Sequence, residues 1–266
     1  MHPFYSFFDR VVCISLRDRT DRHALVRSTS ESLGIAVEMF LVDRHPDGGM
    51  VGCLTSHLAV IRSSLQRAHR SVLIFEDDFV PTPGYSEKVL ASVLDFLGTD
   101  GAWEKVQLGY SPTHDVVDVL GPARFLASPS SSANLVAYTG CFTHAYCLSR
   151  KGMQRIVDAN FPCDVHYDVS LCRLFSGLGT SHCVVPMQFD QKWCLSTDNR
   201  SGTLVEKLVY RPLQCAVGEG LQVFYLVSLL RANRGALLLL LALLLLLTLL
   251  TLPAGGPSQG KRTGIW

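Results

Sequence analysis

Three consecutive acidic residues, Glu76, Asp77 and Asp78, follow the apolar stretch 72–75 and precede a turn containing proline and glycine. Four apolar residues bounded by turn residues are typical of a buried strand in a parallel or mixed sheet. The three acids then lie at the carboxyl end of this strand. Open α/β sheets bind their ligands at the carboxyl ends of their strands. Alternate side chains of an extended segment point the same way, so Glu76 and Asp78 offer oxygen ligands to one divalent cation, which can in turn bind a diphosphate. The alternative is that the acids only solvate the strand end or cap the next helix.

Basic side chains follow an earlier apolar run. Residues 11–16 predict the first strand, and Arg17, Arg19 and Arg22 come directly after it. Guanidinium groups near a strand tip suit phosphate or a base carbonyl, although single arginines are more often ordinary surface residues. The glycine-rich dinucleotide fingerprint is missing after this strand, which argues against a nicotinamide or flavin enzyme.

Glycine and small polar residues at 52–57 lead into a stretch with the apolar spacing of a helix. Backbone N–H groups at a helix start can approach an anion, and Ser56 and His57 lie in this segment. A histidine here is more often packed or capping than a ligand or base. Its position ahead of the acidic strand makes His57 a candidate.

The elements expected to position these residues alternate between strand and helix. Thr20 is expected to cap a helix that runs to about residue 33, with Gly34 as its left-handed stop, and a second strand should follow at 37–42. The serine-rich residues 121–134 are expected to form a flexible loop. A strand followed by a helix is how a nucleotide-binding α/β unit begins, so we expect an α/β domain.

The composition excludes several classes of protein. The chain has 266 residues, of which 48% are hydrophobic and 18% charged, enough for a sizeable core and incompatible with disorder. Its net charge of +1, with no basic face evident, argues against a nucleic-acid partner. The nine cysteines lack zinc-finger and thioredoxin spacing, and we interpret them as mostly buried thiols in a reducing compartment.

The carboxyl-terminal part is strongly apolar. Residues 236–252 are almost continuous leucine, and roughly 17 residues are just enough to cross a bilayer. Basic residues flank both ends, so the positive-inside rule gives no orientation. We expect a catalytic domain (1–210), a membrane-proximal segment (211–235), a transmembrane helix (236–252) and a polar tail (253–266). The amino terminus has no pattern of a secretory signal. A span so near the carboxyl end is normally inserted after translation, so the protein is expected to be membrane-associated with its catalytic domain in the cytosol.

Several motifs occur in a characteristic order. They are Leu-Arg-Asp-Arg-Thr-Asp-Arg at 16–22, Gly-Cys-Leu-Thr-Ser-His-Leu at 52–58, Phe-Glu-Asp-Asp at 75–78, Val-Gln-Leu-Gly at 106–109 and the glycine-to-glycine segment 140–152. This order resembles glycosyltransferase family 25, which contains bacterial lipooligosaccharide galactosyltransferases and animal procollagen galactosyltransferases. The resemblance covers about residues 11–199. It implies an α/β, GT-A-like nucleotide-sugar transferase domain with a mixed, mostly parallel sheet, to which this sequence adds a C-terminal hydrophobic helix.

The resemblance also implies an activity. We expect a metal-assisted and inverting transfer of a hexose, with galactose favoured, from a UDP-sugar to a hydroxyl of a glycan, a lipid-linked saccharide or a protein. The cation, expected to be Mn2+, would be held by Asp78, Asp77 and Glu76. The positions expected to bind the donor are Leu16, Arg17, Arg22, Ser56, His57, Glu76, Asp77 and Gly140.

An inverting transfer needs a base that takes the proton of the acceptor hydroxyl. Asp164 matches the aspartate of the family's Pro-Val-Asp motif, and Asp168 lies one helical turn later. Either residue is nearly as well explained as a helix N-cap. Gln191, Ser196 and Asp198 are expected on the acceptor side, or simply in a turn.

Two other functions remain open. The chain can be a non-catalytic membrane protein that binds a nucleotide sugar, although its intact acidic residues count against the loss of catalysis. It can also be a metal-dependent phosphohydrolase, but further metal ligands would then be expected in recognisable positions. The apolar tail differs from both soluble bacterial and luminal collagen-modifying members of the family, so the acceptor stays open.

Overall fold

The computed structural model describes residues 2–99, 103–113, 120–192, 228–229 and 231–233. Its strands are β1 (Arg10–Leu16), β2 (Glu38–Val42), β3 (Ser71–Glu76), β4 (Phe79–Pro81), β5 (Lys105–Ser111), β6 (Ser130–Ser132), β7 (Leu135–Ala137), β8 (Cys141–Ser149), β9 (Ser181–Val184) and β10 (Phe189–Gln191). Its helices are α1 (Pro3–Ser6), α2 (Thr20–Ser32), α3 (Gly49–Gln66), α4 (Glu87–Leu97), α5 (Gly121–Ala127), α6 (Arg150–Asp158) and α7 (Tyr167–Phe175).

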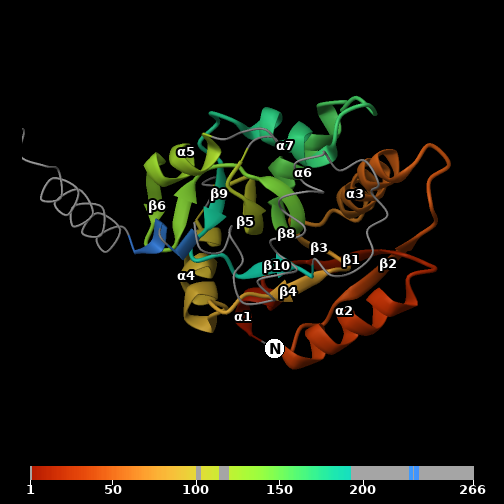
Figure 1. The fold of residues 1–266 in the computed structure, drawn as a ribbon, viewed down its shortest axis with the longest axis horizontal. Helices are drawn as coiled ribbons and strands as arrows, with labels where there is room; N and C mark the ends of the chain where they lie inside the picture. Colours follow the sequence, from red (N-terminus) through yellow and green to blue (C-terminus); the bar gives the residue numbers. More distant parts are fainter. Residues whose placement is uncertain (1, 100–102, 114–119, 193–227, 230, 234–266) are drawn as a thin grey trace, which may run out of the picture. The chain divides into compact units, whose positions relative to one another are not determined.

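Most of the strands belong to one mixed sheet (Figure 1). The order of its eight strands is β2-β1-β3-β8-β5-β9-β7-β6, and β4 and β10 form a separate antiparallel pair. β1 is parallel to β2 and β3, and β5 is parallel to β9, whereas β8 is antiparallel to β3 and β5. β7 is antiparallel to β9 and β6. Only β7 and β8 of these eight strands therefore run against the others, which confirms a mixed α/β sheet with one dominant direction.

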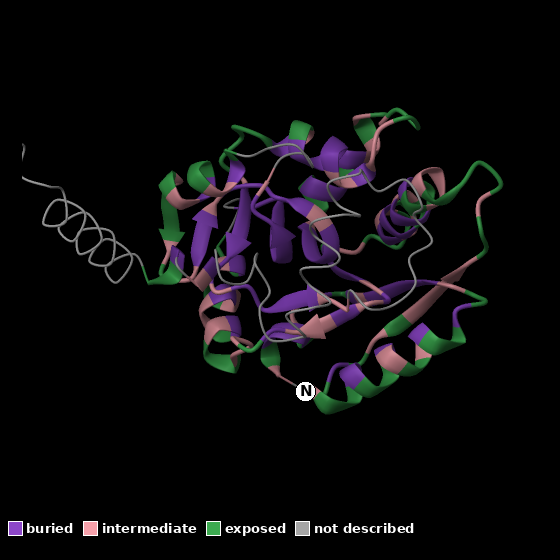
Figure 2. Cartoon of the chain, in the orientation of Figure 1, coloured by how far each residue is buried: buried purple, intermediate pink, exposed green. Residues whose placement is uncertain are grey.

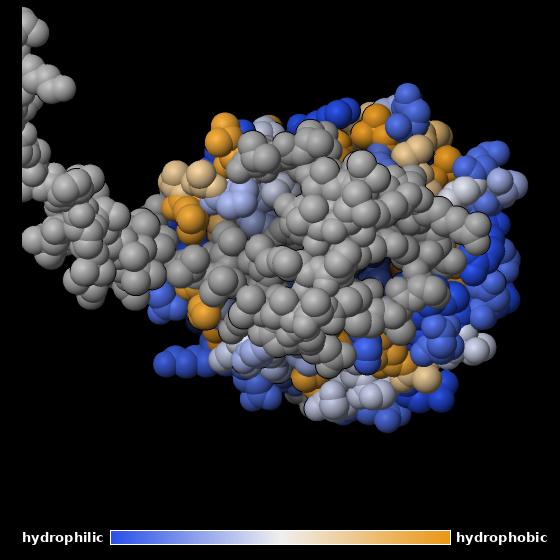
Figure 3. Space-filling model, in the orientation of Figure 1, coloured by the Kyte–Doolittle hydropathy of each residue, from blue (hydrophilic) through white to orange (hydrophobic). Residues whose placement is uncertain are grey.

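Alternate residues of the central strands face two different layers of helices, as the two-residue period of a strand requires. Val12 and Ile74 pack with residues of α3, α6 and α7, whereas Cys13 and Phe75 pack with residues of α1 and α4. Figure 2 shows the strands mostly buried and the outer sides of the helices exposed. Hydrophilic side chains cover the edge of the molecule on which α2 lies (Figure 3). The sheet is thus the middle layer of three.

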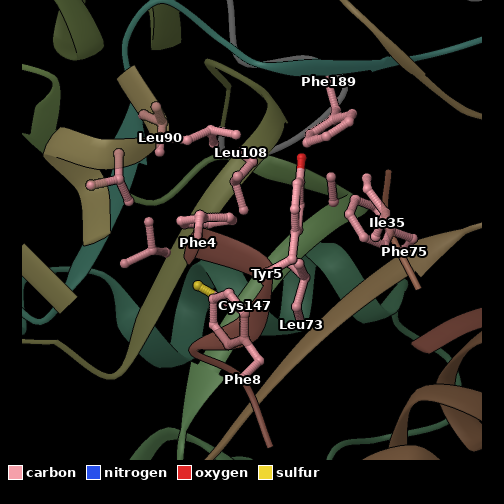
Figure 4. Close-up of a cluster of buried hydrophobic side chains, with 14 of the residues drawn as sticks. Phe4, Tyr5, Phe8, Ile35, Leu73, Phe75, Leu90, Leu108, Cys147 and Phe189 are labelled. Carbon is pink, nitrogen blue, oxygen red and sulfur yellow. The ribbon is translucent and has the colours of Figure 1, made fainter. Parts of the chain in front are cut away.

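The start of the chain contributes more to this core than its sequence indicated. Phe4, Tyr5 and Phe8 are buried, and they lie in a cluster with Leu73 and Phe75 (Figure 4). α1 is too short to show helical periodicity, so only its aromatic content could have signalled burial. Its packing closes the core on the side of the sheet that α4 also covers.

Two expectations about local structure have clear outcomes. Gly34 has a φ of +63° just after α2, which confirms it as a left-handed helix stop. The interpretation of residues 121–134 as a flexible loop is wrong, because this segment contains α5 and β6. Phe125 anchors it: the side chain is fully buried, and its ring lies 5.5 Å from Tyr110 and 5.2 Å from Tyr138.

The chain divides into two compact units, Met1–Ala232 and Asn233–Trp266. None of the helices in the described ranges combines the length and apolar character needed to cross a bilayer. The transmembrane helix expected at 236–252 lies outside the described residues, as do the domain boundaries expected after residues 210, 235 and 252.

The described cysteines are free thiols, and five of them are buried: Cys13, Cys141, Cys147, Cys172 and Cys183. For this part of the chain, the structure agrees with the expectation of mostly buried, unpaired cysteines. Cys194 and Cys215 lie outside the described residues.

Candidate functional site

The acidic residues lie at the carboxyl end of β3, as expected. Glu76 ends this strand, and Asp77 and Asp78 form the connection to β4. Ile14 of β1 pairs with Glu76, so the carboxyl ends of these two parallel strands meet at one edge of the sheet. β2 ends at the same edge, because it runs parallel to β1 on the other side.

Asp77 is fixed inside the protein. Its side chain is 9% exposed, and Ser15 Oγ donates a hydrogen bond to Asp77 Oδ2 at 2.6 Å. Arg22 Nη1 donates to the other carboxylate oxygen in a buried ion pair. These two partners come from β1 and α2, so Asp77 joins the acidic connection to the first strand and helix. Arg22 was expected to bind the donor, but in the structure its guanidinium group contacts the carboxylates of Asp77 and Asp78.

Asp78 has a different environment. Arg22 Nη1 donates to Asp78 Oδ2 at 3.1 Å, while Asp78 Oδ1 is buried and has no hydrogen-bond partner among the described residues. Burial raises the pKa of Asp78 to about 7, the charge of Glu76 adds to this rise, and Arg22 opposes it. A buried carboxylate oxygen without a partner is costly, and a bound cation removes that cost. The Asp78 carboxylate is therefore suited to act as a ligand of a divalent ion.

Glu76 faces another set of partners. Thr143 Oγ1 donates to Glu76 Oε1 at 2.5 Å, and His57 Nε2 lies 3.4 Å from the same oxygen. Burial acts to raise the pKa of the Glu76 carboxyl, but the nearby His57 imidazole, together with the hydrogen bond from Thr143, leaves that pKa below its ordinary value. The three neighbouring acids thus have three different sets of partners, and the structure does not gather them around one point.

His57 belongs to a buried aromatic network. The residue is 1% exposed, and its Nδ1 lies 2.9 Å from the hydroxyl of Tyr146, which is 3.1 Å from the hydroxyl of Tyr167. The imidazole stacks on the Tyr167 ring, with 4.6 Å between the ring centroids. These contacts fix the ring plane and direct Nε2 toward Glu76.

Cys53 joins His57 and Glu76, and we did not single it out from the sequence. One potential ligand atom from each of these residues lies within 4.8 Å of the other two, and the described residues contain no other group of three such side chains at this spacing. Cys53 and His57 are four residues apart on α3, which places them on one helix face. That spacing was a usable signal in the sequence.

The two candidate bases differ in position. Asp168 lies in the first turn of α7, where its carboxylate accepts hydrogen bonds from the backbone N–H groups of Phe142, at 3.1 Å, and Val169, at 2.8 Å. Burial raises the pKa of Asp168, and these two N–H groups act against the rise. Asp164 is exposed in the turn before α7. Asp168 thus also serves to join α7 to β8.

Arg17 and Leu16 lie at the tip of β1. Arg17 is exposed, with Nε 3.3 Å from Asp43 Oδ1 at the end of β2. A surface pocket of about 210 Å³ lies here, lined by Arg17, Asp18, Val42, Asp43 and Arg44. This pocket opens at the same edge of the sheet as the acidic connection, because β1 lies between β2 and β3. The guanidinium and carboxylate groups of this pocket pair with one another, Arg17 with Asp43 and Arg44 with Asp18 at 2.9 Å.

Two other expected donor-binding residues have structural contacts. Ser56 Oγ donates to the carbonyl of Gly52 at 2.6 Å, one turn earlier in α3. Gly140 exchanges two hydrogen bonds of 2.9 Å with the side-chain amide of Gln107. A Cβ at Gly140 would lie 2.2 Å from the carbonyl oxygen of Ser111, so only glycine fits there. Both residues support the frame around the site.

The expected acceptor-side residues are only partly described. Gln191 ends β10 and pairs with Phe79 of β4, and the N–H of Lys192 donates to the carbonyl of Asp78 at 2.8 Å. This brings Gln191 next to the acidic connection from a distant part of the sequence. Ser196 and Asp198 lie outside the described residues.

Comparisons with known proteins give the following result. No protein-family model matches the sequence, and no curated protein matches it. Among solved structures, the chain is similar to a glycosyltransferase involved in glycosylation of the major capsid of PBCV-1, at 8% identity over 71% of this chain and 95% of that one, with a TM-score of 0.41. It is also similar to the catalytic domain of Drosophila beta1,4galactosyltransferase 7, at 8% identity over 75% and 79%, with a TM-score of 0.42.

A third similar structure is the inositol-1-phosphate CTP transferase from T. maritima, at 14% identity over 79% of this chain and 81% of that one, with a TM-score of 0.38. These TM-scores are all below 0.5. We therefore base the functional proposal on the geometry of the site.

Proposed function

We propose that this protein is a glycosyltransferase that uses a nucleotide-sugar donor and a divalent cation held by Asp78. The observation that carries the proposal is the buried Oδ1 of Asp78 just after β3, which has no hydrogen-bond partner within the described part of the chain. Polar atoms in this state are rare in folded proteins, and a carboxylate oxygen is a preferred ligand of Mn2+ and Mg2+. When bound, such a cation would stabilise the negative charge that develops on a diphosphate leaving group.

The neighbouring residues support this role by position. Arg22 donates to both Asp77 and Asp78, so it fixes the direction in which the free oxygen of Asp78 points. Asp77 is committed to Ser15 and Arg22, and Glu76 to Thr143 and His57. We therefore assign cation binding to Asp78 and give Asp77 a positioning role.

The nucleoside end of the donor is proposed to occupy the pocket at the tips of β1 and β2. Arg17 and Arg44 offer guanidinium donors there, and Asp43 can accept a hydrogen bond from a ribose hydroxyl. This pocket and Asp78 lie on the same edge of the sheet, separated by the end of β1. A donor lying across that edge would have its diphosphate nearest Asp78.

Asp168 is the proposed base for the acceptor hydroxyl. Its raised pKa favours uptake of a proton, and two backbone N–H groups hold the carboxylate in one orientation. Asp164 is the second candidate, because it is exposed just before α7. We propose galactose as the first choice for the transferred sugar. The acceptor is proposed to be a hydroxyl group of a glycan, a lipid-linked saccharide or a protein.

Donor turnover by the full chain tests this function. Purified protein is incubated with a panel of UDP-, GDP- and CMP-sugars, with Mn2+ or with a chelator, and release of the nucleotide is measured. We expect one donor to be hydrolysed only with the metal, and Asp78→Asn to lower the rate at least 100-fold, since metal charge stabilisation amounts to several kcal/mol.

Asp95→Asn is the matched control, because Asp95 is exposed on α4 and the change has the same chemistry. Turnover that is equal with metal and with chelator would reject the cation's role. If none of the nucleotide sugars is hydrolysed or bound by the folded protein, the glycosyltransferase proposal fails.

A further inference from the structure

A cluster of different chemistry lies beside the proposed donor site. Cys53, His57 and Glu76 offer a sulfur, a nitrogen and an oxygen, and these atoms lie within 4.8 Å of one another. The proposed cation ligand Asp78 is not a member. A thiol, an imidazole and a carboxylate together are the donor set of zinc, whereas Mn2+ and Mg2+ prefer oxygen ligands.

We propose that Cys53 Sγ, His57 Nε2 and the Glu76 carboxylate form a zinc site distinct from the cation site at Asp78. The distance between His57 Nε2 and Glu76 Oε1 is 3.4 Å. Two ligands on a tetrahedral zinc, with bonds of about 2.0–2.2 Å, lie roughly 3.3–3.5 Å apart. The same distance is long for a direct N–H···O hydrogen bond, which is usually about 2.9–3.0 Å.

The outer contacts of the cluster are those of a prepared metal site. Imidazoles that bind a metal usually make a hydrogen bond through the other ring nitrogen, which fixes the ring. His57 Nδ1 has such a contact with the hydroxyl of Tyr146 at 2.9 Å, and Tyr167 stacks on the ring. Thr143 Oγ1 holds the Glu76 carboxylate at 2.5 Å. His57 and Glu76 are therefore both held in a fixed orientation by neighbouring side chains before any ion binds.

Cys53 supplies the adjustable ligand. It lies one helical turn before His57 on α3, and the residue is at the surface of the helix. Rotation about the Cα–Cβ bond can bring its sulfur to the roughly 3.6 Å from the other ligands that a Zn–S bond of about 2.3 Å requires. A thiolate and a carboxylate together balance the double charge of zinc.

The simpler alternative is a histidine–carboxylate contact with an unrelated cysteine nearby. That arrangement accounts for the contact between His57 and Glu76, but it gives the sulfur of Cys53 no role. Three protein ligands also leave the fourth zinc position open, as in catalytic zinc sites. The cluster therefore predicts an ion that can bind water or a substrate oxygen.

Cobalt substitution tests this proposal directly. The full chain is stripped with a chelator and dialysed. One sample is titrated with Co2+, whose bond to a thiolate gives charge-transfer absorption in the near ultraviolet. A second sample is loaded with Zn2+, and the bound Zn2+ is measured by elemental analysis after excess metal has been removed. We expect a thiolate band, and one equivalent more of bound metal in the wild type than in Cys53→Ser, because any ion held at Asp78 is common to both proteins. Cys53→Ser should abolish the band, and Cys163→Ser, which changes another exposed cysteine, should retain it.

Tyr146→Phe separates a metal site from simple packing. Loss of its hydroxyl should weaken Zn2+ binding by about 10- to 100-fold while the three ligands stay in place. Asp78→Asn should leave the cobalt band intact, so this site can fail or succeed independently of the proposed donor site. Absence of a thiolate band in folded wild-type protein, or an unchanged band in Cys53→Ser, would overturn the proposal.

Discussion

Arg22 shows how single residues organise the edge of the sheet. One guanidinium nitrogen contacts Asp77 and Asp78 together, and the charge of the buried arginine offsets the cost of burying two acids side by side. The sequence predicted that the acidic residues lie at a strand end, but it did not predict which partners each of them has. The alternation of a strand stops at Glu76, and the direction of each later side chain depends on Ser15 and Arg22 from other elements.

Gly140 provides a residue-scale test of the frame around the site. Gly140→Ala should lower the free energy of unfolding by about 2–3 kcal/mol, because its Cβ would lie 2.2 Å from the carbonyl oxygen of Ser111 and both backbones would have to move. Chemical denaturation measures the change. Gly98→Ala is the control: its Cβ meets Asp95 O at 3.5 Å, an ordinary contact, so it should cost less than about 0.5 kcal/mol. Equal losses in the two variants would contradict this explanation.

At the scale of elements, regular patterns were predictable and tertiary anchoring was not. β1, β3 and α2 follow from apolar runs and a glycine stop, all of which are local signals. α5 and β6 were missed because serine and proline suggested a loop, whereas buried Phe125 fixes that segment by contacts with Tyr110 and Tyr138. The pairing of β10 with β4, which brings Gln191 to the site, joins residues more than a hundred positions apart and has no local signal.

β9 carries a buried histidine with a measurable effect on stability. Burial lowers the pKa of His182 from 6.5 to about 4, so the folded protein keeps this side chain neutral while the unfolded chain takes up a proton. The contribution of His182 to the free energy of unfolding is fully present above pH 6.5, and it is lost as the pH falls toward 4. Between pH 7.5 and pH 5 the loss should be about 2 kcal/mol.

Urea denaturation at a series of pH values measures this effect. His182→Gln removes the titrating group, so the variant's free energy of unfolding should fall by about 2 kcal/mol less than that of the wild type over the same range. Other groups titrate equally in both proteins and cancel in the comparison. Parallel pH profiles for the two proteins would show that His182 does not titrate in this way.

At the scale of the whole molecule, the sheet separates two cores and leaves one edge for chemistry. Helices α3, α6 and α7 pack on one side and α1 and α4 on the other, while the ends of β1, β2 and β3 present the pocket and Asp78. The α/β class and the position of the acidic residues at the sheet edge were predictable, because parallel strands bring their carboxyl ends together. Of the Cys53–His57–Glu76 cluster, the sequence signalled only that Cys53 and His57 share a helix face; their meeting with Glu76 was not predictable, because it depends on how α3 packs against the end of β3.

Equilibrium binding of UDP to the full chain, with Mn2+ and with a chelator, tests the central claim most directly. We predict that Mn2+ tightens UDP binding at least tenfold, a difference of about 1.4 kcal/mol, and that Asp78→Asn abolishes this gain while Asp95→Asn preserves it. Isothermal titration calorimetry measures all six combinations of protein and metal state on folded protein. UDP binding of equal strength with and without Mn2+, or a full metal effect in Asp78→Asn, would contradict the assignment of Asp78 as the ligand of a cation that binds the donor diphosphate.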